Sequence, residues 1–330
     1  MNNIDFLAIG DIATEPFIKI KDAEANCDPD GNNCKLCLNY GGKIPYESAT
    51  VCHAVGNSSN VAIGASRLGL NSCLISYIGN DYSGKKNIEQ LNSEKVNTDY
   101  ISTTDGLESN YHYVLWYGSE HTILVKHTEF PYSFPKDLPE PKWIYLSSLA
   151  ENSVSYHREI SQYLDSHPEV FLAFSPGTLQ IKLGIEILKN IYKNTNVFLC
   201  NRSEAQTLLK INENDIPKLL IKMHELGPKI VVITDGINGS YSYDGTDILF
   251  MKAFPDENFV ESTGAGDSFS GAFVVALFLE KDIPTALMWG AANAKSVVKH
   301  VGPHKGLLSR DEIAEYLKNA PKEYTPVKIN

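Results

Sequence analysis

The chain has 330 residues, of which 43% are hydrophobic and 21% are charged, a composition typical of a folded globular protein. Its formal net charge of −11 makes binding to polyanionic DNA or RNA unfavourable. The N-terminus has no signal-peptide pattern, and no apolar run approaches the roughly 18 residues that span a bilayer, so we expect a cytoplasmic protein with no membrane association.

The N-terminal part of the chain begins with a regular pattern and then loses it. An apolar run at 4–9 ends at Gly10 and predicts a buried strand. Residues 20–55 are rich in Gly, Asn, Asp and Cys and predict a loop-rich segment with, at most, short strands. Regular elements then resume, with a helix at 60–68, a strand at 74–78 and a helix that includes 87–91.

A β-hairpin and a series of alternating strands and helices follow. The β-rich runs 111–117 and 122–125 flank a short glycine-containing turn, which predicts the hairpin. Strands are then predicted at 143–146, 170–174, 197–200 and 229–234, and helices at 156–164, 182–192 and 216–226. This alternation predicts an α/β fold with a mostly parallel central sheet and helices on both faces.

The change in character at two places predicts a second, smaller part. We expect an α/β domain formed by residues 1–19, 56–108 and 129–330, and a β-rich lid formed by residues 20–55 and 109–128. Because ligands of such sheets bind at the carboxyl ends of the strands, a lid there would cover the substrate.

Four of the six cysteines lie in or near the predicted lid: Cys27, Cys34, Cys37 and Cys52. Together they have the chemistry to bind zinc as a thiolate tetrad. However, zinc sites of this kind usually contain two close cysteine pairs, and this segment contains one. We favour free thiols, and the metal site remains the alternative.

The strongest functional motif is 261–268, which precedes an apolar helical run. Gly264 and Gly266 allow the backbone to approach a ligand closely, and the N–H groups and dipole at the start of the helix favour an anion. Asp267 lies at this helix start, where its carboxylate can accept the proton of an attacking hydroxyl as a general base. The alternative is that Asp267 only caps the helix.

This motif resembles the C-terminal signature of the ribokinase-like (PfkB) kinases, Asp-Thr-x-Gly-Ala-Gly-Asp, whose final Asp is the catalytic base. Four residues match it: Gly264, Ala265, Gly266 and Asp267. The resemblance implies a ribokinase-like fold and an ATP-dependent kinase that transfers the γ-phosphate to a hydroxyl of a sugar or nucleoside. Glu261 and Ser262 stand where the family has Asp and Thr. Many members bind a monovalent cation near that first acid, and the longer Glu261 leaves this activation open.

A second segment resembles the family's Gly-Gly-x-x-x-Asn substrate motif, with Val55 in place of the first glycine. The resemblance implies that Gly56, Asn57 and Asn60 line the substrate site. The alternative is that Asn60 caps the helix that follows it.

Two charged residues are further candidates for binding the substrate. Glu15 stands where the family has an Asp that binds substrate hydroxyls; the alternative is an ordinary exposed carboxylate. Lys43, in the predicted lid, is our candidate cation for a phosphorylated sugar, and it is equally well read as a solvated lysine.

The C-terminal half carries the residues that the resemblance assigns to ATP and Mg²⁺. Asn201 and Glu204 resemble the family's Asn-x-x-Glu motif, in which the acid holds Mg²⁺ through water; without the family, the pattern indicates a helix cap. Further candidate ATP contacts are Thr234, Gly236, Gly239 and Asn293. The segment that contains the first three also fits a hairpin turn.

Two other nucleotide-binding motifs are excluded by their own residues. The segment 79–86 almost spells a Walker A loop, but Lys86 stands where that loop needs Ser or Thr for Mg²⁺, so we interpret it as a turn. A nicotinamide dehydrogenase would need Gly-x-Gly-x-x-Gly after the first strand, and the residues after Gly10 lack that spacing.

The alternative function is a catalytically silent relative that serves as a binding or scaffold protein. It is motivated by four residues that depart from the family pattern: Glu15, Val55, Ser175 and Glu261. Against it, Asp267 and its neighbouring glycines are intact. The resemblance also implies a homodimer formed through the lid, whose paired edges would cover each other. It leaves open which sugar or nucleoside is the substrate.

Overall fold

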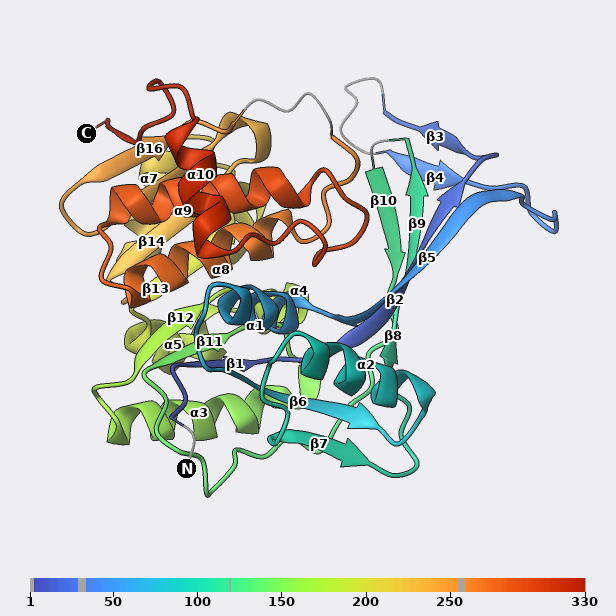
Figure 1. The fold of residues 1–330 in the computed structure, drawn as a ribbon, viewed down its shortest axis with the longest axis horizontal. Coiled ribbons are helices and arrows are strands. Elements are labelled where there is room, and N and C mark those ends of the chain that lie inside the picture. The colour runs from blue at the N-terminus through green and yellow to red at the C-terminus, as the bar shows by residue number, and fades with distance from the viewer. Residues whose placement is uncertain (1–2, 29–33, 119, 255–258, 330) are drawn as a thin grey trace.

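The computed structural model describes residues 3–28, 34–118, 120–254 and 259–329. Its central feature is a ten-stranded sheet, which forms the main body in Figure 1. Its strands are, in spatial order, β17 (Val327–Lys328), β16 (Ile248–Met251), β15 (Ser240–Tyr243), β14 (Ile230–Thr234), β13 (Val197–Asn201), β12 (Phe171–Phe174), β11 (Trp143–Leu146), β1 (Phe6–Ile9), β6 (Ser72–Gly79) and β7 (Ile101–Thr104). Neighbours from β7 to β14 are parallel, and the three pairings from β14 to β17 are antiparallel.

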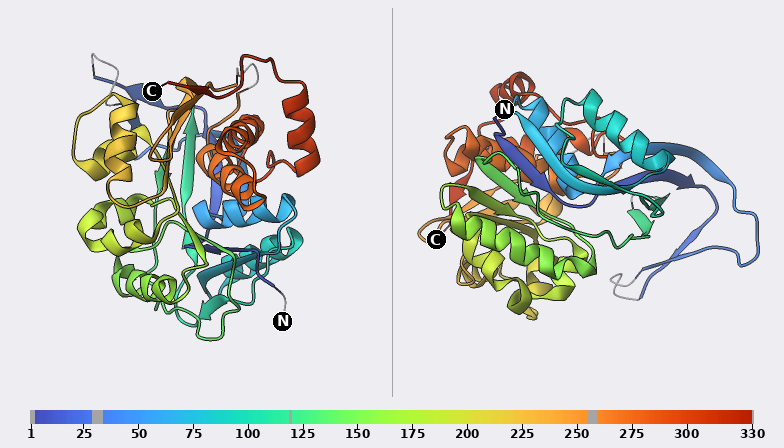
Figure 2. Two further views of the ribbon diagram at one scale, coloured as in Figure 1. Left: turned by 90° about the vertical axis from the view of Figure 1, so that its left-hand side faces the viewer. Right: turned by 90° about the horizontal axis from the view of Figure 1, so that it is seen from below.

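Helices cover both faces of this sheet (Figure 2). One face carries α1 (Asn57–Arg67), α2 (Tyr82–Ser93), α8 (Ala265–Phe278), α9 (Ile283–Val297) and α10 (Arg310–Lys318). The other carries α3 (Val154–Ser166), α4 (Thr178–Leu183), α5 (Ile185–Asn194), α6 (Arg202–Leu209) and α7 (Ile216–His224). The predicted α/β fold with a mostly parallel central sheet is confirmed.

The central strands show why both faces must be covered. In β1, Phe6 and Ala8 belong to one hydrophobic core, and Leu7 and Ile9 belong to the other. Successive side chains of a strand point to opposite faces, so an uninterrupted apolar run feeds two cores at once.

A second, five-stranded sheet projects from the body and forms the lid (Figure 1). Its strands are β2 (Ala13–Ile20), β5 (Tyr46–Val55), β8 (Asn110–Tyr111), β9 (Tyr113–Tyr117) and β10 (Glu120–Leu124). β2 pairs antiparallel with β5 and parallel with β9. It therefore belongs to the lid sheet, although all of it except Ile20 lies before the predicted start of the lid at residue 20. The predicted hairpin is β9–β10; residue 119 of its turn lies outside the described residues.

The prediction of free thiols is wrong for two cysteines, because Cys27 and Cys34 form a disulfide. They follow and precede the antiparallel strands β3 (Glu24–Asn26) and β4 (Lys35–Cys37), in which Asn26 pairs with Lys35. The hairpin register therefore places the two thiols opposite each other. Cys37 and Cys52 are free, and the described residues contain no cluster of three or more His, Cys, Asp or Glu arranged to bind a metal.

The segments 182–192 and 79–86 differ in how closely they follow their predictions. The helix predicted at 182–192 is interrupted at Gly184, which separates α4 from α5. The segment that resembles a Walker A loop forms the end of β6 and the start of α2, where Asp81 caps the helix by accepting the Gly84 N–H at 2.7 Å. In the described part of the chain, no helix has both the length and the apolar character needed to cross a membrane.

Candidate active site

The start of α8 has the geometry of an anion site. Gly264 precedes the helix with φ 78°, and a Cβ there would lie 2.4 Å from Cβ of Pro303, so this position requires glycine. The Ala265 N–H donates to the carbonyl oxygen of Ser262 at 3.1 Å. The N–H groups that follow belong to the open first turn, where helix donors have no intrahelical acceptor and favour an anion.

The Asp267 carboxylate, in the same first turn, is held by two amides from α1. Asn57 Nδ2 donates to Oδ1 at 2.9 Å, and Asn60 Nδ2 donates to Oδ2 at 2.7 Å. Burial raises the pKa of Asp267, these two hydrogen bonds lower it, and the charge of Glu15 raises it. The N-cap residues of α8 and α1 are Gly264 and Gly56, so the alternative interpretation of Asp267 and Asn60 as helix caps is wrong.

A buried histidine orients one of these amides. His304 Nε2 lies 2.8 Å from Oδ1 of Asn60, and burial lowers the pKa of His304 to about 4. The neutral imidazole can donate its Nε2–H to the amide oxygen, which directs the amide nitrogen of Asn60 towards Asp267. His304 lies outside every motif predicted from the sequence.

Glu15 is a buried residue of β2 rather than an exposed loop carboxylate, so that alternative is also wrong. Its Oε1 lies 3.0 Å from Nδ1 of His112, which follows β8. A Cβ at Gly56 would lie 2.6 Å from the Asp11 carbonyl oxygen, so the start of α1 and the end of β1 approach each other closely. Glu15, Gly56, Asn57, Asn60 and Asp267 therefore lie around one region.

The Asn-x-x-Glu segment forms a reciprocal cap at the start of α6. The side chain of Asn201 accepts the Glu204 N–H at 2.9 Å, and Glu204 accepts the Asn201 N–H at 2.8 Å. Burial raises the pKa of Glu204, and the charge of Asp267 raises it further, so the two acids are within electrostatic reach of each other. The capping interpretation is confirmed.

The turn after β14 lies next to this cap. Thr234, the last residue of β14, pairs with Asn201 in the parallel ladder and with Ser240 in the antiparallel one. Gly236 and Gly239 lie in the short connection between β14 and β15, so the predicted hairpin turn is confirmed.

Asn293 and Lys43 are the two remaining candidates. Asn293 is 1% exposed; its Nδ2 donates to the Ser268 carbonyl oxygen and its Oδ1 accepts the Leu308 N–H, both at 2.9 Å. Its buried amide thus joins α9 to the start of α8 and to the segment before α10. Lys43 is exposed in the connection between β4 and β5, at the free end of the lid (Figure 1).

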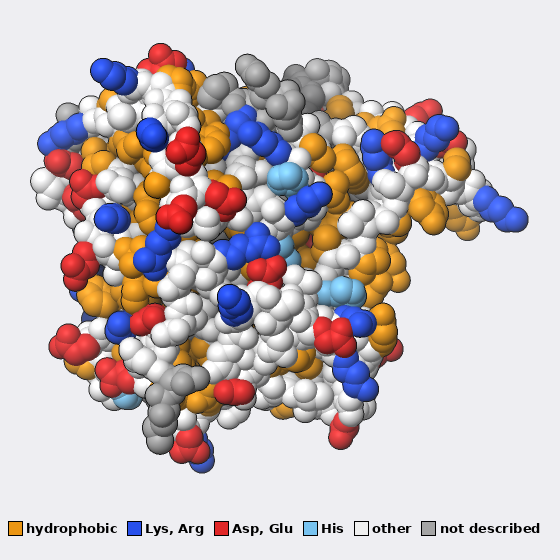
Figure 3. Space-filling view, in the orientation of Figure 1, with side chains coloured by type: hydrophobic (Ala, Val, Ile, Leu, Met, Phe, Trp, Pro, Cys, Tyr) orange, Lys and Arg blue, Asp and Glu red, His pale blue; other side chains and the backbone are white. Residues whose placement is uncertain are grey.

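The lid contacts the 261–267 loop through a histidine. His121 of β10 places Nε2 2.6 Å from Oγ1 of Thr263 and 3.4 Å from Oε2 of Glu261. The buried Glu261 also accepts the Gly302 N–H at Oε1 and the Thr263 N–H at Oε2. Histidine side chains are visible along the junction of lid and body in Figure 3.

Sequence reasoning missed these histidines, although a signal was present. Three of the nine histidines in the chain lie within residues 112–127, at positions 112, 121 and 127. Each lies within 3.4 Å of a carboxylate of residue 15, 261 or 11, respectively. A cluster of the one side chain that titrates near neutrality, next to a predicted site, would have been a reason to include them.

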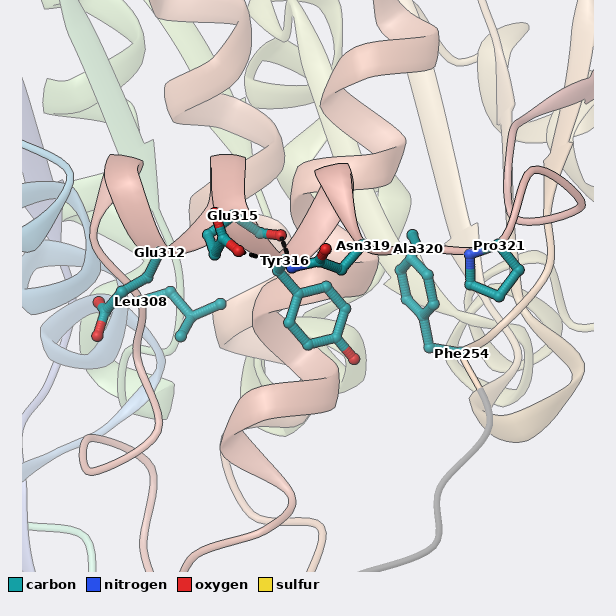
Figure 4. A pocket seen from close by; sticks show the side chains of 8 residues that line it. All are labelled: Phe254, Leu308, Glu312, Glu315, Tyr316, Asn319, Ala320 and Pro321. Carbon is teal, nitrogen blue, oxygen red and sulfur yellow. Dashed lines mark hydrogen bonds between the residues drawn. The ribbon is translucent and has the colours of Figure 1, made fainter.

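A separate pocket of about 520 Å³ lies between α10 and Phe254 (Figure 4). It is lined by Phe254, Leu308, Glu312, Glu315, Tyr316, Asn319, Ala320 and Pro321. None of the predicted site residues is among them, so this pocket is distinct from the region around Asp267.

The chain matches the family model described as "pfkB family carbohydrate kinase" over residues 23–309. A relative named ribokinase, from Bacillus subtilis (strain 168), is 27% identical over 271 residues, which is 79% of this chain and 87% of the relative.

Two solved structures are similar in fold. The Arabidopsis thaliana ribokinase complexed with ribose and ATP has a TM-score of 0.80 at 19% identity, and the match covers 97% of this chain and 100% of the other. A putative ribokinase II from E. coli in complex with ATP and Mg²⁺ has a TM-score of 0.73 at 17% identity, and the match covers 96% of this chain and 100% of the other.

Proposed function

The chain belongs to the pfkB family of carbohydrate kinases and is thus a phosphotransferase with an alcohol group as acceptor, and we propose that it transfers the γ-phosphate of ATP to a hydroxyl of a sugar or nucleoside with Asp267 as the general base. One observation carries the proposal: the Asp267 carboxylate, oriented by Asn57 and Asn60, lies in the first turn of α8. The candidate general base therefore lies next to the anion site at the start of α8.

The chemistry follows from this arrangement. Ionised Asp267 accepts the proton of the attacking hydroxyl, which makes that oxygen a better nucleophile. The N–H groups of Gly266 and Asp267 stabilise the negative charge on the transferred phosphoryl group, because they are fixed in position before the reaction begins. The lid excludes water that would otherwise accept the phosphoryl group.

The residues at the carboxyl ends of β13 and β14 fit the nucleotide end of this reaction. Glu204 is a half-buried carboxylate suited to holding Mg²⁺ through water, and the described residues offer no multidentate cluster that would strip the ion of its waters. When bound, Mg²⁺ neutralises phosphate charge. Thr234, Gly236 and Gly239 would contact the phosphates. The E. coli neighbour was solved with ATP and Mg²⁺, which supports this proposal.

A monovalent cation fits Glu261 poorly. Both of its oxygens accept backbone N–H groups, and His121 approaches one of them. Since the carboxylate is already surrounded by donors, we assign no step to such an ion.

Three further proposals concern the whole chain. We propose the division into an α/β domain and a lid, a homodimer that uses the lid, and a cytoplasmic location. Exposed Leu38, Tyr46, Val51 and Leu124 on lid segments support the second.

The deciding experiment measures ADP release with Mg-ATP across sugars, sugar phosphates and nucleosides for the wild type and Asp267→Asn. We expect one acceptor to be turned over and its kcat to fall at least about 100-fold in the variant. Asp282→Asn is the matched control, because Asp282 also lies at a helix start but serves as the N-cap of α9. Equal turnover by Asp267→Asn and the wild type would exclude Asp267 as the base. Absence of turnover with every acceptor would favour the silent binding protein.

A further inference from the structure

Four charged or titratable side chains meet where β1 joins the lid, and we call them the junction cluster: Asp11, Glu15, His112 and His127. His112 Nδ1 lies 3.0 Å from Oε1 of Glu15, and His127 Nε2 lies 3.2 Å from Oδ2 of Asp11. The centroids of the two imidazole rings are 5.6 Å apart. The two pairs therefore form one continuous group, of which only Glu15 was predicted as a site residue.

The cluster is buried but incompletely paired. Asp11 is 4% exposed; its Oδ2 accepts the Tyr132 hydroxyl at 2.7 Å and the Ala150 N–H at 3.1 Å. Within the described residues, Asp11 Oδ1, His112 Nε2 and both ring nitrogens of His127 are inaccessible to solvent and have no hydrogen-bond partner, although His127 Nε2 lies close to Asp11. A buried polar atom without a partner is destabilising, and native proteins contain few of them. Several at one place indicate that another molecule supplies the missing partners.

The junction cluster adjoins the proposed point of phosphoryl transfer. The charge of Glu15 raises the pKa of Asp267, so the two carboxylates are within electrostatic reach. Asp11 is linked to the same region through its backbone, which Gly56 approaches at the start of α1. A small molecule whose reacting hydroxyl lies at Asp267 would thus extend towards the cluster.

The charges of the cluster restrict what that molecule can be. In the described part of the chain, the contacts of Asp11, Glu15 and Asp267 are histidine, asparagine, tyrosine and backbone N–H groups, and no lysine or arginine pairs with them. A phosphate monoester, with a charge of about −1.5 to −2, would meet these carboxylates without a permanent cation to balance it. Hydroxyl groups both donate and accept, which suits a mixed set of carboxylates and imidazoles.

We propose that Asp11, His112 and His127, together with Glu15, form a subsite for the non-reacting hydroxyl groups of an uncharged sugar or nucleoside, and select such acceptors over their phosphate esters. The proposal rests on the proposed kinase function for the position of the reacting hydroxyl. It assigns specificity to Asp11, His112 and His127, none of which was predicted as a site residue.

The test uses matched pairs of acceptors that differ by one phosphate: D-ribose with ribose 5-phosphate, D-fructose with fructose 6-phosphate, and adenosine with AMP. We expect kcat/KM of the wild type to be at least tenfold higher for the uncharged member of the pair that is turned over. Substituting His127→Gln or Asp11→Asn is expected to raise the KM for that acceptor about 10–100-fold, the loss of a charge-assisted hydrogen bond, with the KM for ATP unchanged.

Two controls keep the result interpretable. His167→Gln changes a histidine at the far end of α3 and should leave both KM values unchanged. Melting temperatures of all variants show which are folded, and His127→Gln is informative even where Asp11→Asn loses its contacts with Tyr132 and Ala150. Preference for the phosphate ester, or an unchanged acceptor KM in the folded His127→Gln variant, overturns the subsite.

The subsite and the kinase function can fail separately. If the wild type releases no ADP with any acceptor, calorimetric titration with the same pairs decides about the subsite. Binding of an uncharged member that weakens in His127→Gln supports the subsite and contradicts the kinase assignment. Binding of none of the pairs, or preferred binding of a phosphate ester, overturns the subsite.

Discussion

Asp267 is subject to opposing influences that two single substitutions can separate. Removing the amide in Asn60→Ala deletes a hydrogen bond that lowers the pKa of Asp267, whereas Glu15→Gln deletes a charge that raises it. A general base works when ionised, so kcat falls as the pH drops through its pKa. We expect the acid limb of the kcat profile to move to higher pH in Asn60→Ala and to lower pH in Glu15→Gln. Shifts in the same direction would contradict this assignment.

Two glycines of the 264–267 segment have very different surroundings and make a matched pair. Gly264→Ala places a Cβ against Pro303 at a left-handed backbone position, whereas a Cβ at Gly266 meets no atom within 4 Å. We expect Gly264→Ala to lower the free energy of unfolding by about 1–3 kcal/mol, and Gly266→Ala, inside α8, to leave it unchanged or to raise it by up to about 1 kcal/mol. Denaturant unfolding of both variants measures the difference. Equal destabilisation would contradict the inference that Gly264 is required by its conformation.

The residues of the candidate site divide into those with and those without a sequence signal. The segment around Asp267 was identifiable because closely spaced glycines before an apolar helix have few structural uses other than ligand approach. His304 and His127 were not identifiable, because they lie in segments without periodicity and meet the site only through the tertiary fold. Asp11 lies in the segment 10–15 that contains the candidate Glu15, but nothing in the sequence shows that its side chain meets a histidine of the lid. Asn293 was placed in the correct helix, but its side-chain partners come from Ser268 and Leu308, which sequence spacing does not reveal.

At the level of elements, β10 of the lid contacts the loop before α8 through His121. We expect His121→Ala to loosen this contact and raise the KM for the acceptor severalfold, since the Nε2 contacts with Thr263 and Glu261 are lost. Thr122→Ala, on the next and exposed position of the same strand, is the control and should leave the KM unchanged. His121→Gln, which retains a polar group, should raise the KM for the acceptor less than His121→Ala does. An unchanged KM in His121→Ala would show that this contact does not couple lid and loop.

The elements of the body were predictable and those of the lid largely were not. β1, β11 and β12 are continuous apolar runs bounded by polar or glycine residues, and their predicted bounds lie within two residues of the structure. In contrast, β5 is exposed over most of its length, so it lacks the apolar pattern that marks a strand. β2 contains Pro16, which argues against a strand when only local sequence is considered.

At the scale of the whole molecule, two buried neutral histidines make stability depend on pH. Burial lowers the pKa of His157 and of His304 from 6.5 to about 4. The unfolded chain binds these protons below pH 6.5 and the folded protein only below about pH 4. The contribution of these two histidines to the free energy of unfolding is therefore fully present above pH 6.5. It is lost as the pH falls towards 4, by up to about 1.4 kcal/mol per pH unit for each histidine.

His157 allows a direct test of this dependence, because it is not one of the candidate site residues and its ring nitrogens contact Ser153 and Gln180. Between pH 7 and pH 5 we expect the free energy of unfolding to fall by up to about 2 kcal/mol more in the wild type than in His157→Gln, measured by denaturant unfolding at both pH values. Parallel pH dependence of the two proteins would show that His157 does not remain neutral in the folded state.

The central position of β2 in the lid has a consequence for the order in which the chain is made. β2 and β5 leave the ribosome early and can pair, but the other edge of β2 stays open until β8 and β9 are synthesised. At roughly 5–20 residues per second, nascent chains expose that edge for several seconds. A growing polypeptide thus carries an unpaired strand edge well before its catalytic loop exists, and this interval is when a chaperone would have most to protect.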